Sequence, residues 1–257
     1  MKISMMAIAK ISLAIIVFAR ILCFALCTDS ALVSLTSKRT HFISVATKPH
    51  PRLEILRKSF TENNETITFL EMGSSIPLGW GTGGFGLKMQ ALFAYIHSDN
   101  VRSDDLIVNL DAYDTFYCGT TAELESRFVS MDKEVVFGAE RFIWPDRDRK
   151  YPDSDLKEYF PYLNSGLFIG RVSALRELME GYDFDPKEDD QRYWTTKYLE
   201  RPDLIELDHD NLIFLNCAGI DISELTYINR AAHFRMKNPL IVHGNGDDKS
   251  CLGKFNL

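Results

Sequence analysis

The most constraining feature of this sequence is the run Leu106-Ile107-Val108-Asn109-Leu110, which leads directly into Asp111-Ala112-Tyr113-Asp114. A short, nearly continuous apolar run without alternation is typical of a strand buried on both faces, as in parallel sheets covered by helices. In open α/β sheets, ligands bind at the carboxyl ends of the strands. The run therefore predicts a central strand that carries Asp111 and Asp114 into a ligand-binding edge.

Strand and helix patterns alternate along the rest of the chain. Branched and apolar runs predict strands near 40–47, 66–70, 135–137, 163–170, 205–207, 213–215 and 240–242, and helical periodicity predicts helices near 51–60, 87–95, 121–128, 172–180 and 188–198. A chain of 257 residues accommodates one such α/β domain more readily than two. We expect residues 28–257 to form a single domain with a mixed, mostly parallel central sheet flanked by helices. The charged stretch 147–159 is expected to be a mobile loop.

Two aspartates three residues apart suit a hard divalent cation, although the same pattern also arises where aspartates cap backbone N–H groups in a turn. A second apolar strand, 240–242, ends in His243 and is followed by Gly244-Asn245-Gly246. Two carboxylates and one imidazole fit Mn²⁺ better than Mg²⁺ or Ca²⁺, because imidazole is a borderline donor. The pattern predicts a Mn²⁺ site formed by Asp111, Asp114 and His243. The alternative for His243 alone is a hydrogen-bonded core histidine.

The net charge of −7 argues against a general nucleic-acid-binding protein or a protein that binds anionic membranes. An acidic protein that binds an anionic ligand must concentrate positive charge locally. A bound metal ion would do so.

The first 27 residues are typical of a signal peptide. Lys2 and Lys10 precede an apolar stretch, and Ala25 and Cys27 are small residues at the positions that signal peptidase prefers. A membrane-spanning signal-anchor is the alternative, but Arg20 divides the apolar stretch into pieces shorter than the roughly 20 residues that cross a bilayer. The segment predicts entry into the secretory pathway, with residence in the endoplasmic reticulum lumen or secretion.

Two further features bear on that compartment. Asn64-Glu65-Thr66 is an N-glycosylation sequon between two predicted elements, where a surface loop is expected. Outside the predicted signal peptide the cysteines are Cys118, Cys217 and Cys251, and three cysteines allow one disulfide at most. Their spacing fits no zinc site.

Five blocks in this order resemble the glycosyltransferase domain of the procollagen lysyl hydroxylases. They are residues 109–114 (NLDAYD), 140–145 (ERFIWP), 163–170 (LNSGLFIG), 189–191 (DDQ) and 242–246 (VHGNG), and the resemblance extends from about residue 42 to the C-terminus. The resemblance implies a GT-A type, Rossmann-like glycosyltransferase fold. It also implies a donor, UDP-glucose or UDP-galactose, held with Mn²⁺.

The resemblance implies roles for individual residues. The metal ligands correspond to Asp111, Asp114 and His243, and the uridine and ribose contacts to Val45, Ala46, Thr47 and Tyr113. The diphosphate contacts correspond to the loop from Gly246 to Lys249, with Lys88 as a further candidate or, alternatively, a solvated helix residue. Trp144 and Asn164 correspond to residues that line the sugar pocket, where an indole stacks on the sugar and an amide pairs with its hydroxyls. The alternative for Trp144-Pro145 is a buried turn anchor.

Glycosyl transfer needs a carboxylate near the positively charged sugar and an oriented acceptor hydroxyl. Asp189 and Asp190 are the predicted catalytic residues, since they resemble part of an acidic catalytic run in the family. That run is longer in the family than Glu188-Asp189-Asp190. The alternative is that both acids complement the dipole of the helix that begins there.

The resemblance predicts a hexosyltransferase that transfers glucose from a UDP-sugar to galactosyl-hydroxylysine of collagen-like acceptors. Two alternatives remain open: galactose transfer to hydroxylysine, and a catalytically weak UDP-binding chaperone or interaction domain. The family has a second tryptophan shortly after the first, and here Arg147-Asp148-Arg149 stands in its place. That difference concerns the acceptor more than the donor.

Overall fold

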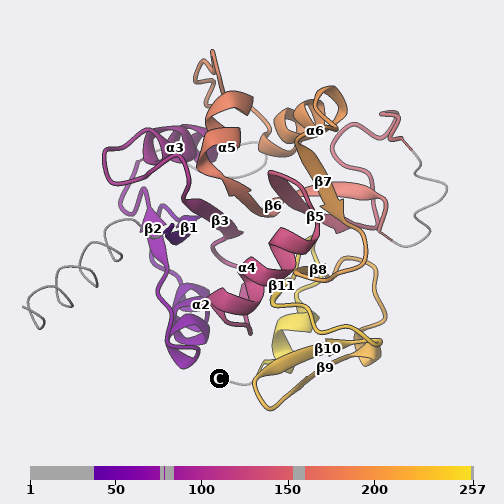
Figure 1. The fold of residues 1–257 in the computed structure, drawn as a ribbon. Coiled ribbons are helices and arrows are strands. Elements are labelled where there is room, and N and C mark those ends of the chain that lie inside the picture. The colour runs from indigo at the N-terminus through magenta and orange to yellow at the C-terminus, as the bar shows by residue number, and fades with distance from the viewer. Residues whose placement is uncertain (1–37, 76–77, 79–83, 153–159, 256–257) are drawn as a thin grey trace, which may run out of the picture. The chain divides into compact units, whose positions relative to one another are not determined.

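A six-stranded sheet forms the core of the fold, in the order β2-β1-β3-β6-β5-β7 (Figure 1). The computed structural model describes residues 38–75, 78, 84–152 and 160–255, and residues 40–257 make up a compact unit of their own. The strands are β1 (Thr40–Val45), β2 (Thr68–Leu70), β3 (Leu106–Asp111), β5 (Val135–Glu140), β6 (Tyr162–Arg171) and β7 (Ile205–Asp208). Within this sheet β6 runs antiparallel to both of its neighbours, whereas every other pairing is parallel. The predicted mixed and mostly parallel sheet is confirmed.

Helices cover both faces of the sheet (Figure 1). They are α2 (Pro51–Glu62), α3 (Gly86–Ile96), α4 (Thr121–Ser130), α5 (Val172–Leu178) and α6 (Asp190–Glu200). Ile107 of β3 packs in the core cluster that contains residues of α3, α5 and α6. Its neighbours Leu106 and Val108 pack in a second cluster, with residues of α2 and α4. Each of these side chains contributes about 2 kcal/mol by burial, and burial on both faces explains why β3 is a continuous apolar run.

A smaller sheet positions the histidine. It consists of β4 (Thr115–Tyr117), β11 (Ile241–His243) and β8 (Phe214–Asn216), in the order β4-β11-β8. β4 begins one residue after Asp114 and runs antiparallel to β11, with Thr115 opposite His243. This pairing carries His243 to the turn between β3 and β4, although more than 100 residues separate the two segments in sequence.

No sequence pattern predicted β4 or four short elements that follow β8. β9 (Leu225–Ile228) and β10 (Ala231–Phe234) form a two-stranded antiparallel sheet, and the 3₁₀ helices η2 (Ile222–Glu224) and η3 (Ser250–Lys254) lie nearby in sequence. These segments are short and contain few of the periodic apolar positions that mark longer elements. None of the helices among the described residues is both long and apolar enough to cross a membrane.

Two predicted segments lie wholly or partly outside the described residues, and other predictions concern Asn64 and the cysteines. The predicted signal peptide, residues 1–27, lies outside the described residues, as does 153–159 of the predicted loop; residues 147–152 have no regular secondary structure. Asn64 of the sequon is exposed in a turn after α2, so its placement in a surface loop is confirmed. Cys118, Cys217 and Cys251 are buried free thiols.

Candidate functional site

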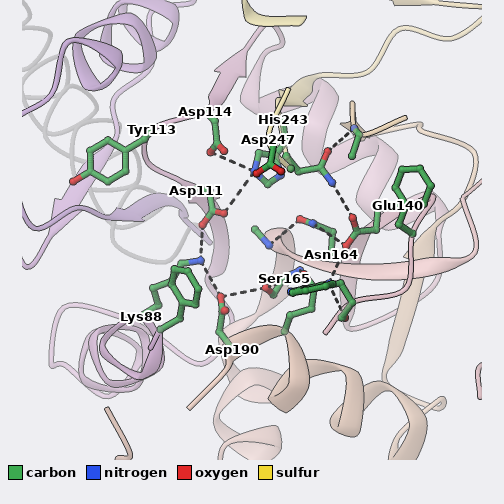
Figure 2. Close-up of a pocket in the computed structure, with 18 of the residues that line it drawn as sticks. Lys88, Asp111, Tyr113, Asp114, Glu140, Asn164, Ser165, Asp190, His243 and Asp247 are labelled. Carbon is green, nitrogen blue, oxygen red and sulfur yellow. Dashed lines mark hydrogen bonds and ion pairs between the residues drawn. The ribbon is translucent and has the colours of Figure 1, made fainter. Parts of the chain in front are cut away.

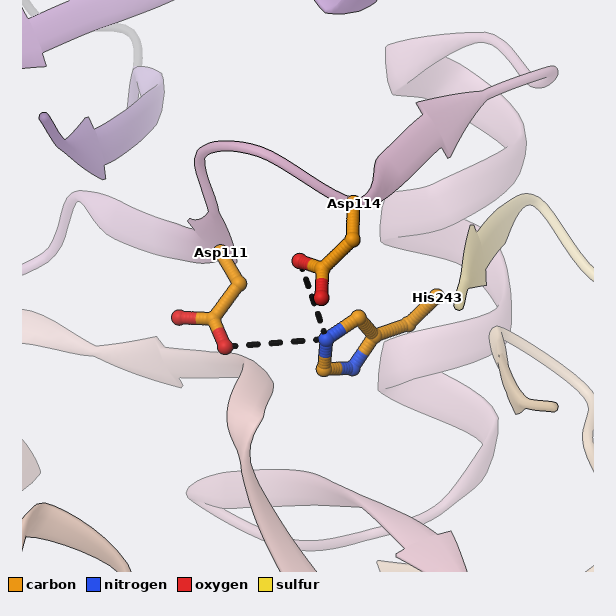
Figure 3. A group of neighbouring side chains, drawn as sticks. All are labelled: Asp111, Asp114 and His243. Carbon is orange, nitrogen blue, oxygen red and sulfur yellow. Dashed lines mark ion pairs between the residues drawn. The ribbon is translucent and has the colours of Figure 1, made fainter. Parts of the chain in front are cut away.

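Asp111, Asp114 and His243 meet at the carboxyl edge of the sheet (Figure 3). Asp111 is the last residue of β3, Asp114 lies in the turn that follows, and His243 is the last residue of β11. The Nε2 atom of His243 lies 3.6 Å from Asp111 Oδ2 and 3.3 Å from Asp114 Oδ1. The ligand atoms of the three residues all lie within 4.8 Å of one another. The structure thus brings together the three residues that the sequence suggested as metal ligands.

Asn216 orients the imidazole from behind. Its side-chain Nδ2 donates to the carbonyl oxygen of Ala139 at 3.0 Å, so its Oδ1 faces His243 Nδ1 at 2.8 Å. An amide oxygen only accepts hydrogen bonds, and Nδ1 must therefore carry the proton. The Nε2 atom is left facing the two carboxylates, where a cation can bind it. Partners of this kind fix the tautomer of metal-binding histidines.

The charges of the three residues in this cluster depend on one another. Burial opposes ionisation of His243, but Asp114 and Asp111 raise its pKa above the usual range. Burial also opposes ionisation of Asp114, yet His243 and Lys249 hold its pKa below the usual range. Opposite charges packed together favour the ionised forms, so a metal that binds Nε2 must displace the proton that the imidazolium carries there. Two carboxylates and one imidazole nitrogen are a donor set that suits Mn²⁺, and so the residues present fit a divalent metal.

Gly166 leaves room for this cluster. It lies in β6, next to the residue that pairs with Leu110 of β3. A Cβ atom at Gly166 would lie 2.5 Å from His243 Cε1 and 2.7 Å from Asp111 Oδ2. Contacts that short force a shift of the neighbouring side chains. Gly166 is therefore required for the arrangement of Asp111 and His243.

Two lysines border the cluster, and Figure 2 labels one of them, Lys88. Lys88 Nζ lies 2.6 Å from Asp111 Oδ1 and 2.9 Å from Asp190 Oδ2. Although burial acts against its charge, these two carboxylates raise the pKa of Lys88. Lys249 Nζ lies 2.6 Å from Asp114 Oδ2. Lys88 is thus a partly buried ion-pair partner rather than the solvated helix residue that the sequence left as an alternative.

A cavity of about 990 Å³ opens beside the cluster, at the upper end of the range for small-molecule sites. The predicted binding residues that line it are Val45, Lys88, Tyr113, Trp144, Asn164, Gly246 and Lys249, together with Asp111, Asp114, His243 and Asp190. Ala46 and Thr47 are not among the lining residues: Ala46 is fully buried, and the carbonyl oxygen of Thr47 accepts a hydrogen bond from Gly73 N. Trp144 is 42 % exposed, which excludes the alternative of a buried turn anchor.

Asp189 and Asp190 have different surroundings. Asp189 is the N-cap of α6, and its Oδ1 accepts a hydrogen bond from Arg192 N at 2.9 Å. Asp190 lines the cavity, where its Oδ2 accepts hydrogen bonds from Lys88 Nζ at 2.9 Å and Ser165 Oγ at 3.2 Å. The helix therefore explains the presence of Asp189, whereas Asp190 faces the place where a ligand would bind. A catalytic role for either residue stays a prediction.

Sequence reasoning gave no role to Glu140, a buried carboxylate in the wall of the cavity. Its two oxygen atoms accept hydrogen bonds from the side-chain amides of Asn164, Gln191 and Asn245 at 3.1, 2.9 and 2.8 Å. These partners come from three other segments of the chain. The only sequence feature that pointed to Glu140 was its place in the block 140–145.

Burial raises the pKa of Glu140 from 4.5 to about 7, although the three amides and the charge of His243 act in the opposite direction. The folded protein therefore binds this proton more tightly than the unfolded chain. The stability that this provides is complete below pH 4.5 and is lost as the pH rises through 7. Glutamine at this position has no such dependence. The free energy of unfolding of Glu140→Gln, minus that of wild type, is expected to rise by about 2 to 3 kcal/mol from pH 5 to pH 8.

Urea denaturation in EDTA at a series of pH values measures this difference. Glu134→Gln is the matched control, because Glu134 directly precedes β5 and is 44 % exposed, paired with Arg171. A difference between Glu140→Gln and wild type that stays constant from pH 5 to pH 8 would contradict the prediction.

The fold and the site define a GT-A type, Rossmann-like α/β protein with an acidic and histidine-containing cluster at the carboxyl edge of its sheet. The chain belongs to the family of the PLOD GT domain, whose sequence model matches residues 36–256. The resemblance and the fold class inferred from the sequence are both confirmed.

Individual relatives agree with this assignment. A Caenorhabditis elegans multifunctional procollagen lysine hydroxylase and glycosyltransferase is 32% identical over 82% of this chain and 31% of its own length. The human multifunctional procollagen lysine hydroxylase and glycosyltransferase LH3 is 32% identical over 65% of this chain and 24% of its own length. The chain therefore spans less than a third of these relatives. Mouse xyloside xylosyltransferase 1 in its apo form covers 80% of this chain and 98% of its own, with a TM-score of 0.44 and 16% identity, a likeness too weak to bear on function.

Proposed function

We propose that this protein is a Mn²⁺-dependent hexosyltransferase that transfers glucose from UDP-glucose to galactosyl-hydroxylysine of collagen-like acceptors. The observation that carries the proposal is the cluster of Asp111, Asp114 and His243 beside a cavity of about 990 Å³. Membership in the PLOD GT domain family supports the reaction class. The names of the relatives, which join procollagen lysine hydroxylase to glycosyltransferase, support the acceptor.

The residues of the cavity divide the work of the reaction. Mn²⁺ held by Asp111, Asp114 and His243 would neutralise, as a Lewis acid, the charge that develops on the diphosphate leaving group. Lys249, which now pairs with Asp114, would add positive charge at the same place. The uridine would lie against Val45 and Tyr113, which line the cavity near the end of β1 and the turn after β3.

The hexose would occupy the other side of the cavity. The exposed ring of Trp144 offers a stacking surface for the apolar face of a sugar. Asp190 would orient the acceptor hydroxyl and stabilise positive charge on the sugar. Lys88 holds the Asp190 carboxylate next to Asp111, so the proposed catalytic acid is positioned beside the proposed metal site.

Charged residues occupy the segment where the resemblance to the family implies a second tryptophan. The guanidinium of Arg147 lies 5.5 Å from the centre of the Trp144 ring, and Arg149 donates to Thr196 Oγ1 at 2.7 Å. These contacts put charged groups, rather than a second indole, near the place where an acceptor would enter. Galactose transfer to hydroxylysine and UDP binding without turnover are therefore the two alternatives to glucose transfer.

We also propose that the protein works in the secretory pathway, in the endoplasmic reticulum lumen or after secretion. The predicted signal peptide and the exposed Asn64 of the sequon support this. An N-linked glycan at Asn64 would support the proposal further. It would appear as a loss of mass after glycosidase treatment of protein produced by a eukaryotic cell.

UDP release with UDP-glucose or UDP-galactose tests the function, in the presence of Mn²⁺ or EDTA. Deglucosylated collagen, fully deglycosylated collagen and no acceptor are compared. We expect Mn²⁺-dependent UDP release that is largest with UDP-glucose and deglucosylated collagen. Release with UDP-galactose and deglycosylated collagen would favour the galactosyl alternative. UDP binding without release in any combination would favour the chaperone alternative, and release that EDTA leaves unchanged would refute the metal site.

A further inference from the structure

Glu140 joins four segments of the chain around the cavity. It is the last residue of β5, and its three amide partners lie in β6 (Asn164), in α6 (Gln191) and in the loop after β11 (Asn245). Oε1 accepts from Asn164 and Gln191, and Oε2 accepts from Asn245. Above its pKa of about 7, Glu140 is a carboxylate that only accepts hydrogen bonds, and all three NH₂ groups turn toward it.

This orientation sets what the other end of each amide can do. With their NH₂ groups turned inward, the amides use their oxygen atoms to accept from backbone N–H groups: Asn164 Oδ1 from Gly166 N at 3.0 Å, Gln191 Oε1 from Ser165 N at 3.2 Å, and Asn245 Oδ1 from Ala218 N at 2.8 Å. Gly166 is the residue that leaves room for Asp111 and His243. Gln191 Nε2 also donates to the carbonyl oxygen of Trp144 at 3.0 Å. Glu140 therefore reaches Asn164 directly and Trp144 through Gln191.

The geometry points to Glu140 as the positioning residue of the hexose subsite, which holds Asn164 and Trp144 in place through one hydrogen-bonded carboxylate. This inference rests on the proposed function, because it takes the hexose of a UDP-sugar as the ligand between Trp144 and Asn164. It goes beyond that function by naming the group that shapes the subsite. Glu140 and Asn164 lie on the opposite side of the cavity from Tyr113 (Figure 2).

Stability alone does not account for an ionised group at this place. Glu140 is only 6 % exposed, and burial works against its charge. Replacing a buried charged network by neutral groups is often neutral or stabilising. A residue that disfavours folding in its charged form, yet lines the cavity, is better explained by the shape that it gives to the binding site.

Calorimetric titration with UDP and with UDP-glucose, both with Mn²⁺, tests the inference on the whole chain. The dissociation constant of UDP divided by that of UDP-glucose measures what the hexose adds to binding, apart from the nucleotide. We expect Glu140→Gln to reduce this ratio at least tenfold while the dissociation constant of UDP changes less than threefold. Glu134→Gln is expected to match wild type, because Glu134 pairs with Arg171 at the other end of β5.

A second variant shows whether positioning is the cause. In Glu140→Gln the new NH₂ group, placed at Oε2, would face the NH₂ of Asn245. The double variant E140Q/N245D restores an acceptor at that point and leaves Oε1 for Asn164 and Gln191. We expect the double variant to restore most of the reduction in this ratio. If the Glu140 carboxylate bound the sugar directly, the double variant would not restore it.

The outcomes are distinct. An unchanged ratio in Glu140→Gln, or a loss that the double variant does not recover, would overturn this inference and leave the proposed function standing. Failure of the wild-type protein to bind UDP with Mn²⁺ would overturn the proposed function and this inference with it.

Discussion

Asp111→Asn and Asp114→Asn are each expected to weaken Mn²⁺-dependent UDP binding at least about 100-fold, because loss of even an outer partner of a metal ligand typically costs 10- to 100-fold in affinity. Each change removes one of the two negative charges that face His243 Nε2. Asparagine keeps the shape of aspartate, so the packing of the turn between β3 and β4 is retained. The loss should appear as weaker binding rather than as unfolding.

Titration calorimetry of UDP with Mn²⁺ and with EDTA measures this effect, and circular dichroism in EDTA checks the fold. Asp104→Asn is the matched control. Asp104 is an exposed acid that pairs with Arg102 just before β3 begins, at the opposite end of the strand from Asp111. UDP affinity that remains the same in both variants, or that falls equally in Asp104→Asn, would refute the metal assignment.

Much of the fold could be predicted because its central elements are strongly patterned. β3 is apolar on both faces since each face meets a separate core cluster, and this burial is written directly into the run Leu106–Leu110. α2 has apolar residues at Leu53, Leu56 and Phe60 and begins at Pro51, a favoured first position. Local pattern and tertiary packing agree in these segments, which is why their type could be read from sequence.

The geometry of the site was less predictable, because it depends on pairings between distant segments. β4 is three residues long, too short for a periodic pattern, yet its pairing with β11 brings His243 to Asp114. The hydrogen bonds of Glu140 reach Asn164, Gln191 and Asn245, which are dispersed over some 80 residues. No local rule indicates that four such polar residues share one buried network. The strand-end pattern and the family resemblance picked out the three candidate metal ligands, but only the structure shows which residues support them.

Adjacent residues with unlike roles also limited what the sequence could predict about the site. Asp189 and Asp190 have the same side chain, and either could serve the helix or the reaction. Their surroundings differ because the first is an N-cap with an extended backbone and the second lies in the first turn of α6. The N-cap aspartate turns back to its own helix, whereas Asp190 projects toward Lys88 and Ser165. A sequence pattern cannot separate two roles that depend on the backbone conformation of one residue.

Asp190→Asn is expected to lower kcat about 100- to 10,000-fold, the range that a positioned acid or base contributes. UDP affinity with Mn²⁺ should change less than about threefold, since Asp190 is not among the three residues expected to hold the metal. The reason is local: the change removes the carboxylate that faces the cavity and contacts Lys88 and Ser165. Lys88 retains Asp111 as a partner at 2.6 Å, so this partly buried lysine keeps one counter-charge and the fold should survive.

Comparison with Asp189→Asn separates catalysis from capping. Asparagine caps a helix as well as aspartate does, so Asp189→Asn keeps full turnover if Asp189 acts only through its hydrogen bond to Arg192 N. Turnover with UDP-glucose and deglucosylated collagen is measured for both variants, alongside UDP affinity. If Asp190→Asn turns over at the wild-type rate, Asp190 has no catalytic role. If both variants lose turnover while UDP affinity holds, the two acids act together, because a carboxylate at the N-terminus of α6 is then needed for more than the helix.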